Sequence, residues 1–156
     1  PQGVCLEETH DIVYKPLAQT SEPSSAGITP SLTAEWQRDL VPDDVLLFRY
    51  SALTFNSHRI HYDRRYAMQT EGYPGLVVHG PLMASLLIDL LRRHSDRMLS
   101  SFAFKALKPV FECADQRVLR LCAKPEGDEI HTWVQDHHGH VCMQAVAHWS
   151  TQAATP

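Results

Sequence analysis

The stretch "HGPLMASLLIDLLRRH", residues 79–94, carries the strongest structural signal in the chain. Pro81 suits the first helical position, where its missing N–H costs nothing, and Gly80 can serve as the N-cap. Apolar residues then cover nearly every side of the predicted helix, which is typical of a helix buried inside a domain. The basic residues 92–94 suit the negative C-terminal end of the helix dipole. We therefore predict one buried helix over residues 81–94.

Four segments after this helix have the alternation and composition of β-strands. They cover residues 100–113, 117–124, 129–136 and 140–150. Short connections such as "PEGD" and "HHGH" predict that they form an antiparallel meander. Alternation in the last segment places these residues on one face: Val141, Met143, Ala145, Ala147 and Trp149. One buried helix followed by such strands indicates an α+β domain whose sheet curves around the helix.

The region before the helix is less regular. The run "DVLLFRYSA", residues 44–52, fits either a buried strand or the start of a helix, and periodicity does not decide between them. Residues 64–70 are predicted to be helical. The sequence "EGYPG" that follows contains two glycines and a proline, and it is expected to end that helix.

Composition limits the classes of function. The chain has 156 residues, a formal charge of −4 and a pI near 6.2, which suit one domain and argue against a nucleic-acid-binding protein. No apolar run is long enough to cross a membrane. The four cysteines are scattered without a CxxC pair, so we expect reduced thiols in a cytoplasmic protein.

The first 31 residues differ in character from the rest. Val4 to Pro16 resembles a strand with too little around it to bury, and the following "LAQTSEPSSAGITPS" has linker composition. We predict an N-terminal arm and linker over residues 1–31, a domain over 32–150 and a tail over 151–156.

The stretch "TFNSHRIHYD", residues 54–63, concentrates polar side chains shortly before the apolar helix. Together with "PGLVVHGPLMASLL" and the strands beyond, it resembles the MaoC-like hydratase/dehydratase family. The resemblance implies the hot-dog fold, a curved antiparallel sheet wrapped around a long central helix. The wording of the two blocks is most similar to the branch that contains mesaconyl-CoA and itaconyl-CoA hydratases. That branch often carries two hot-dog units in one chain, so the N-terminal arm resembles the end of a preceding unit.

The resemblance implies which residues are catalytic. The family's catalytic histidine falls on His61, its carboxylate falls on Asn56, and the second block begins with His79 and Gly80. Hydration of an enoyl thioester requires a group that moves protons and a group that stabilises the enolate oxygen. A histidine suits the first task, and a backbone N–H at a helix N-terminus, here that of Gly80, suits the second.

Six further residues are expected to bind substrate: Arg59, His58, Asp63, Tyr73, Val78 and His79. Arg59 suits a clamp for a substrate carboxylate, because arginine pairs with carboxylates, and a surface salt bridge is the alternative. His58 is expected to support His61 rather than to react. Tyr73 has the alternative role of shaping the turn.

Asn56 is a departure from the family pattern. An amide is not a base at neutral pH, although it can orient a water molecule by hydrogen bonds. His61 then does the proton work alone, or Asp63 or His58 assists it, or catalysis is weak or lost. The branch resemblance argues against loss.

The sequence predicts an enzyme that adds water to, or removes it from, an α,β-unsaturated acyl-CoA, with a short branched dicarboxylic substrate such as itaconyl-CoA or mesaconyl-CoA. The alternatives are a 3-hydroxyacyl-thioester dehydratase of fatty acid metabolism and a non-catalytic acyl-thioester-binding module. No cofactor and no metal site are expected, because the "HHGH" turn (137–140) lacks a complete ligand set. An unpaired sheet edge would favour a homo-oligomer or pairing with a second hot-dog unit.

Overall fold

The computed structural model describes residues 3–4, 7, 28–112 and 118–150. Most of the predicted arm and linker and the whole predicted tail lie outside these residues. The elements in chain order are β1 (Trp36–Leu40), α1 (Asp44–Leu53), the 3-10 turn η1 (Arg59–His61), α2 (Arg64–Gln69), β2 (Leu76–Val77), α3 (Gly80–His94), β3 (Leu99–Ala106), β4 (Phe111–Glu112), β5 (Leu119–Glu126), β6 (Glu129–Gln135) and β7 (Val141–Trp149).

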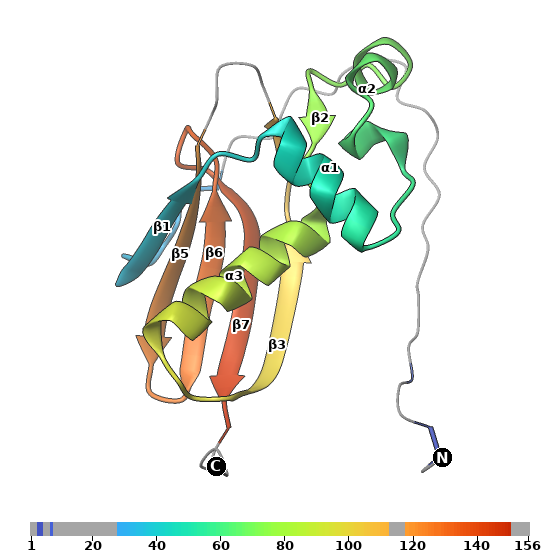
Figure 1. Ribbon diagram of the computed structural model, residues 1–156. Helices are drawn as coiled ribbons and strands as arrows, with labels where there is room; N and C mark the ends of the chain where they lie inside the picture. Colours follow the sequence, from blue (N-terminus) through green and yellow to red (C-terminus); the bar gives the residue numbers. More distant parts are fainter. Residues whose placement is uncertain (1–2, 5–6, 8–27, 113–117, 151–156) are drawn as a thin grey trace.

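Helix α3 lies across one face of a five-stranded antiparallel sheet with the strand order β1-β5-β6-β7-β3 (Figure 1). The side of α3 that faces the sheet is buried in the main core through Leu82, Met83, Ala84, Leu87, Leu90 and Leu91. Strands β5, β6 and β7 contribute the opposite half of this core. The predicted helix and the predicted hot-dog fold are therefore confirmed.

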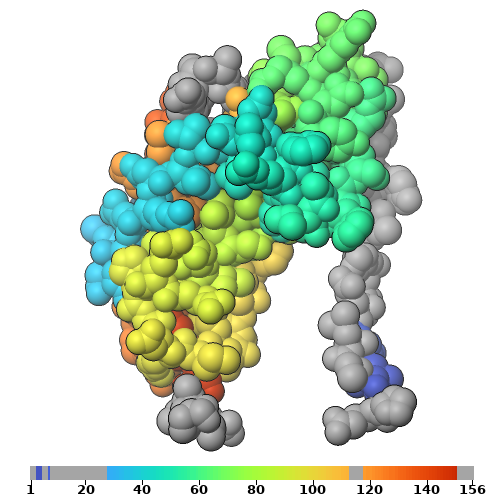
Figure 2. Space-filling model, in the orientation of Figure 1, coloured from blue at the N-terminus to red at the C-terminus, as the bar shows by residue number. Residues whose placement is uncertain are grey.

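Two details of the predicted helix are corrected. His79 is the N-cap and Gly80 is the first helical residue, one position earlier than predicted. The helix is also less buried than its apolar composition indicated, because Pro81, Ser85 and Arg92 are exposed. Figure 2 shows part of the surface of α3 open to solvent on the side away from the sheet. In the single chain, α3 thus packs one broad face rather than all of its sides.

The predicted four-strand meander is wrong in its first member. Strands β5, β6 and β7 do follow one another as neighbours, but β3 pairs with β7 at the far edge of the sheet. The predicted strand over 100–113 also ends early. Pro109, which has no N–H to donate, interrupts it, and Phe111–Glu112 forms the separate strand β4 against β2. The chain therefore leaves the sheet between β3 and β5, so no hairpin joins them.

The predicted alternation along β7 holds from Met143 onward. Met143, Ala145, Ala147 and Trp149 belong to the core beneath α3, but Val141 packs on the other face of the sheet. The pairing explains the difference, because Val134 lies opposite Met143 and Gln135 lies opposite Val141. One extra residue is therefore accommodated in β7, and this bulge reverses the side to which Val141 points.

The ambiguous run 44–52 lies in helix α1. The side chain of Asp43 caps it by accepting a hydrogen bond of 2.7 Å from the backbone N–H of Leu46. The predicted helix over 64–70 is confirmed as α2, which Asp63 caps in the same way through Tyr66 N–H at 2.9 Å. Strand β1, which pairs with β5, was not predicted, because "WQRDL" has little strand character. Helices α1 and α2 and strand β2 gather near the N-terminal end of α3 (Figure 1).

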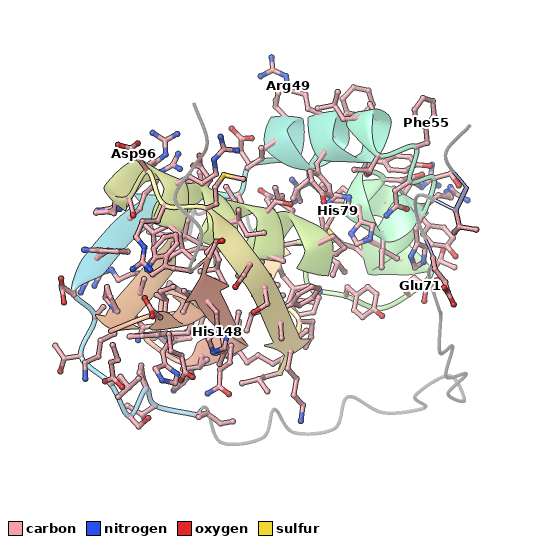
Figure 3. The ribbon with its side chains drawn as sticks, turned by 90° about the horizontal axis from the view of Figure 1, so that it is seen from below. Arg49, Phe55, Glu71, His79, Asp96 and His148 are labelled. Carbon is pink, nitrogen blue, oxygen red and sulfur yellow. The ribbon has the colours of Figure 1, made fainter. Side chains whose placement is uncertain are left out.

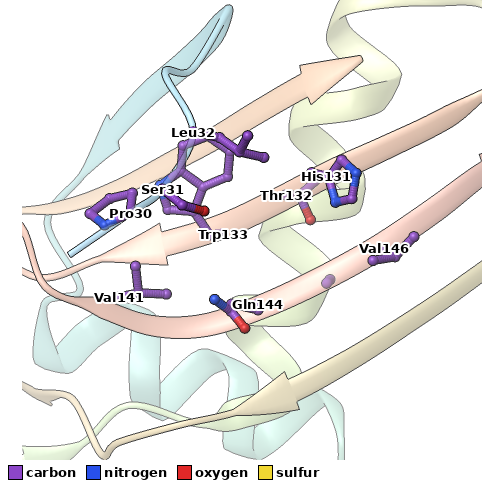
Figure 4. A pocket seen from close by; sticks show the side chains of 10 residues that line it. Pro30, Ser31, Leu32, His131, Thr132, Trp133, Val141, Gln144 and Val146 are labelled. Carbon is purple, nitrogen blue, oxygen red and sulfur yellow. The ribbon is translucent and has the colours of Figure 1, made fainter. Parts of the chain in front are cut away.

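The face of the sheet opposite α3 is partly covered by residues 28–35. Leu32 and Ala34 pack there against a small cluster formed by Cys122, Trp133 and Val141. A hollow of about 170 Å³ lies beside Leu32 on this face (Figure 4). Among the residues that the structure describes, no helix has both the length and the apolar character needed to cross a membrane.

Candidate active site

His61 is held at the end of η1 with a defined proton arrangement. Its ring is 9% exposed, and its Nδ1 lies 2.7 Å from the carbonyl oxygen of Val77. A carbonyl oxygen only accepts hydrogen bonds, so Nδ1 must carry the proton. In the neutral ring, Nε2 is then left with a free lone pair. The neutral ring of His61 is therefore able to accept a proton at Nε2.

The surroundings of His61 favour this neutral form. Burial lowers the pKa of His61 below its usual value, and the neighbouring His58 lowers it further, whereas the hydrogen bond to Val77 raises it. The rings of His58 and His61 meet edge to face with centroids 5.6 Å apart. At neutral pH the imidazole of His61 is thus ready to accept a proton.

His79 lies directly behind His61. The two rings are stacked, with centroids 3.8 Å apart and planes within 16° of each other. His79 is only 1% exposed, and its Nε2 lies 2.8 Å from the hydroxyl of Ser51 on α1. Burial, with a smaller contribution from His61, lowers the pKa of His79 from 6.5 to about 4. This burial favours a supporting role over the predicted contact with substrate.

Asn56 follows a strained turn at the end of α1. Phe55 has a φ of 53°, a left-handed conformation that bulky residues rarely adopt. The Asn56 side chain then accepts a hydrogen bond of 3.0 Å from the backbone N–H of His58 through its Oδ1. This bond orients the amide, and the NH₂ group of Asn56, which bonds to no residue that the structure describes, is available to a ligand.

Arg59 and Asp63 pair with each other. The Nε and Nη2 of Arg59 donate to one Asp63 oxygen at 3.2 and 2.8 Å, and the guanidinium lies 4.2 Å from the centre of the Tyr66 ring. These contacts match the alternative reading of Arg59 as a surface salt bridge. Asp63 is also the cap of α2, so a structural role accounts for it. Substrate contact by either residue stays a prediction.

Two more predicted residues support the backbone around the site. Val78 is buried, and its N–H donates to the carbonyl of Val110 at 2.8 Å. Tyr73 packs its ring against Phe111, with centroids 5.6 Å apart, which agrees with the turn-shaping alternative. Their contact with substrate stays a prediction.

Gly80 begins α3 immediately after His79. The side chain of the N-cap residue, His79, makes no hydrogen bond to the helix end. It therefore does not satisfy the first backbone N–H groups of α3. Among the described residues, a Cβ placed on Gly80 would meet nothing within 4 Å. The helix N-terminus thus adjoins open space, as an oxyanion site requires.

Sequence reasoning missed Ser51 and the carbonyl of Val77. Ser51 stands in the apolar run of α1, 28 residues from its partner His79, and nothing local in the sequence signals the contact. Figure 3 shows His79 between α1 and α3, where these segments meet. No group of three or more metal-ligating side chains occurs among the residues that the structure describes.

A family model described as hydroxyacyl-thioester dehydratase type 2 matches residues 1–112. The chain belongs to this family. The resemblance read from the two sequence blocks is thereby confirmed, and the matched region contains η1, β2 and the whole of α3.

Two curated proteins are similar to this chain in sequence. A protein of Chloroflexus aurantiacus named mesaconyl-C(4)-CoA hydratase is 48% identical over 143 residues, which cover 91% of this chain and 50% of the relative. The mitochondrial hydroxyacyl-thioester dehydratase type 2 of Schizosaccharomyces pombe is 30% identical, over 80% of this chain and 41% of the relative. The chain therefore spans half or less of the length of these relatives.

A solved structure supports the fold. The (R)-hydratase from A. caviae superposes with a TM-score of 0.60 and 19% identity, over 75% of this chain and 95% of that one. At this level of identity the likeness concerns the fold alone.

The low pKa of His79 predicts a pH-dependent stability. Between about pH 6.5 and 4 the unfolded chain binds a proton at His79 that the folded chain does not, so stability falls as the pH is lowered through this window. We expect the free energy of unfolding to decrease by about 1–2 kcal/mol more between pH 7 and pH 5 in the wild type than in His79→Phe. Urea unfolding at both pH values measures this. An equal decrease in the two proteins would contradict the assignment.

Proposed function

We propose that the chain provides the catalytic unit of a hydro-lyase that adds water to, or removes it from, an α,β-unsaturated acyl-CoA. The observation that carries the proposal is the arrangement of His61. Its Nδ1–H is held by the carbonyl of Val77, its Nε2 lone pair is free, and the ring stacks on the residue that precedes the N-terminus of α3. This arrangement supports a base that lies near an oxyanion site.

In the hydration direction, His61 Nε2 takes a proton from water as the water oxygen bonds to the β-carbon. The electron pair of the double bond moves toward the thioester, whose oxygen becomes negative and lies at the N–H of Gly80. The same proton is then returned from His61 to the α-carbon, and the thioester carbonyl is restored. Asn56 orients the water or the enolate through its NH₂ group. Each step uses a group whose protonation state the structure supports.

A short branched dicarboxylic acyl-CoA, such as mesaconyl-CoA or itaconyl-CoA, is the proposed substrate. The 48% identity to a protein named mesaconyl-C(4)-CoA hydratase supports this choice. Arg59 follows Asn56 by three positions in the sequence, and its positively charged side chain is 55% exposed. It would reach a substrate carboxylate only by exchanging its bond to Asp63.

A 3-hydroxyacyl-thioester dehydratase of fatty acid metabolism is the second candidate. The description of the matching family and the name of the S. pombe relative favour it. The two candidates share the chemistry at His61 and differ in the acyl chain. The third candidate is a non-catalytic module that binds an acyl thioester. It is favoured by Asn56, which stands where the family pattern has a carboxylate.

The acyl-CoA itself is the main proposed partner, and a second hot-dog unit is the other. Strand β3 forms one edge of the described sheet, and its Phe104 is 50% exposed. Helix α1 and the turn after it also expose Phe48 and Phe55, by 60% and 95%. Unpaired edges and exposed apolar surfaces of this kind are usually covered.

We also propose a cytoplasmic location. Cys122 and Cys142 are free and buried, and burial raises the pKa of each thiol to about 11. Thiols of this kind are unreactive and need no oxidising compartment.

The first prediction from the proposed function concerns His61. His61→Ala should lower kcat for hydration of mesaconyl-C(4)-CoA by ~10²–10⁴-fold, the loss expected when a general base is removed. Loss of the conjugated thioester absorbance measures the rate, and circular dichroism shows whether the fold survives. If neither wild type nor variant hydrates any enoyl-CoA tested above the uncatalysed rate, the binding-module alternative replaces the enzyme, whereas equal catalysed rates would exclude His61 as the base.

The second prediction separates two roles of Asn56. Because Oδ1 is bonded to the N–H of His58, we expect the NH₂ group to be the functional part. Asn56→Asp keeps the acceptor but adds a negative charge beside the developing enolate, so its kcat should fall as far as that of Asn56→Ala. Steady-state kinetics of both variants tests this. An Asn56→Asp variant that keeps or exceeds the wild-type rate would show that residue 56 only orients water.

The third prediction concerns assembly. Static light scattering at micromolar concentration should give a mass of two or more units, with β3 at the interface. Phe104→Lys, which places a charge on the exposed edge strand, should shift the mass toward one unit. Lys105→Arg, on the same strand, serves as the control. A wild-type protein that is monomeric under these conditions would contradict self-pairing of this unit.

A further inference from the structure

Ser51 and His79 form a buried polar pair that the proposed reaction does not use directly. Ser51 is 4% exposed and His79 is 1% exposed, so both are inside the protein. Their contact, 2.8 Å between the Ser51 hydroxyl and His79 Nε2, connects α1 to the N-cap of α3. Buried polar groups are costly unless they are paired. A pair at this position, directly behind the proposed base, therefore calls for an explanation.

The pair lies where it can restrict the orientation of the His61 ring. The hydrogen bond to Val77 holds the Nδ1 atom of His61, but a single bond leaves the ring free to tilt about it. The stacked ring of His79, with centroids 3.8 Å apart, fixes the plane of His61. His79 is itself fixed from two sides, by Ser51 at Nε2 and by the edge-to-face ring of Tyr50 at 4.9 Å.

The tautomer of His79 follows from its unpaired nitrogen. Among the described residues, Nδ1 of His79 is buried and has no hydrogen-bond partner. If Nε2–H donates to the Ser51 hydroxyl, the unpaired atom is an acceptor, whereas the other tautomer would bury an unpaired N–H. Orphaned N–H groups are the rarer case in proteins. The favoured arrangement is Nε2–H donating to Ser51.

A neutral ring behind His61 also suits the reaction. When His61 takes a proton, it becomes an imidazolium whose face lies against His79. A second charge there would oppose this step at a separation of 3.8 Å. Burial keeps His79 neutral, with its pKa near 4, so the stacked ring supports His61 without competing for the proton.

We propose that Ser51 and His79 are positioning residues, which set the plane of the His61 ring and so direct its Nε2 at the reacting water. This inference rests on the proposed function, in which His61 is the base. It identifies two residues that act through His61 and touch no reacting atom. Ser51 in particular stands outside both sequence blocks that resemble the family.

The kinetic test uses Ser51→Ala, His79→Phe and the double variant, with mesaconyl-C(4)-CoA as substrate. Phenylalanine keeps a ring in the stack but cannot bond to Ser51. We expect each single variant to lower kcat by about 10- to 100-fold with KM nearly unchanged, because a catalytic group misplaced by ~1 Å can lose about 100-fold in rate. If Ser51 acts only through His79, the double variant should be no slower than His79→Phe.

Thr54→Ala is the matched control, because it removes an exposed hydroxyl at the end of the same helix. It should leave kcat unchanged. A Ser51→Ala protein with the wild-type kcat would overturn the proposal. Two other results would also overturn it. One is that the losses in kcat of the two single variants multiply in the double variant. The other is that a single variant keeps the wild-type kcat per folded molecule while its melting temperature falls.

A spectroscopic test separates this inference from the proposed function. ¹⁵N spectra of the histidine rings should show His61 protonated at Nδ1 and His79 protonated at Nε2 in the wild type. In Ser51→Ala the His79 ring should populate both tautomers, and the His61 signals should broaden. A protein that shows these signals but hydrates no enoyl-CoA would refute the function and keep the Ser51–His79–His61 arrangement. Unchanged His61 and His79 signals in Ser51→Ala would refute the positioning role itself.

Discussion

Burial of one face of α3 against the sheet is the constraint on which the rest of the molecule depends. Leu87, Leu90 and Leu91 are completely buried there, and full burial of a leucine side chain contributes about 1.5–3 kcal/mol. This packing fixes the direction of the helix axis. The N-terminal end of α3 then has to emerge where α1, η1 and β2 gather. The polar segment before the helix is thereby brought to the positive end of the helix dipole. At that end Gly80 adjoins open space, which leaves room for a ligand.

The parts of the fold that the sequence predicts are those with a local signal. Helix α3 is recognisable because Pro81 and a dense apolar run coincide, and α2 because a proline and two glycines end it. Strands β5, β6 and β7 follow from alternation and short turns. In the site, His61 and Gly80 were identified through the two sequence blocks that resemble the family, and the structure connects them through the stacked ring of His79.

The parts that the sequence does not predict depend on contacts between distant segments. The place of β3 beside β7 is decided by how the chain leaves the sheet after Pro109, which no local pattern records. The side to which Val141 points is set by a bulge. Ser51 is hidden for the same reason, because a serine in an apolar helix acquires meaning only when α1 is packed against residue 79. Arg59 is the opposite case. Its position in the sequence suggests a clamp for a substrate carboxylate, but in the structure it pairs with the carboxylate of Asp63.

The absence of a carboxylate at Asn56 gives the buried histidines a consistent physical role. A carboxylate near the oxyanion site would disfavour the enolate, whereas an amide adds no charge. In the proposed reaction the proton chemistry falls to the imidazole of His61, and burial favours the neutral form that can accept a proton. A lower pKa makes a weaker base, but it ensures that the base is unprotonated at neutral pH. In the proposed reaction only one group moves the proton, so the position of that group matters more, and a buried neutral ring stacked on His61 meets this requirement.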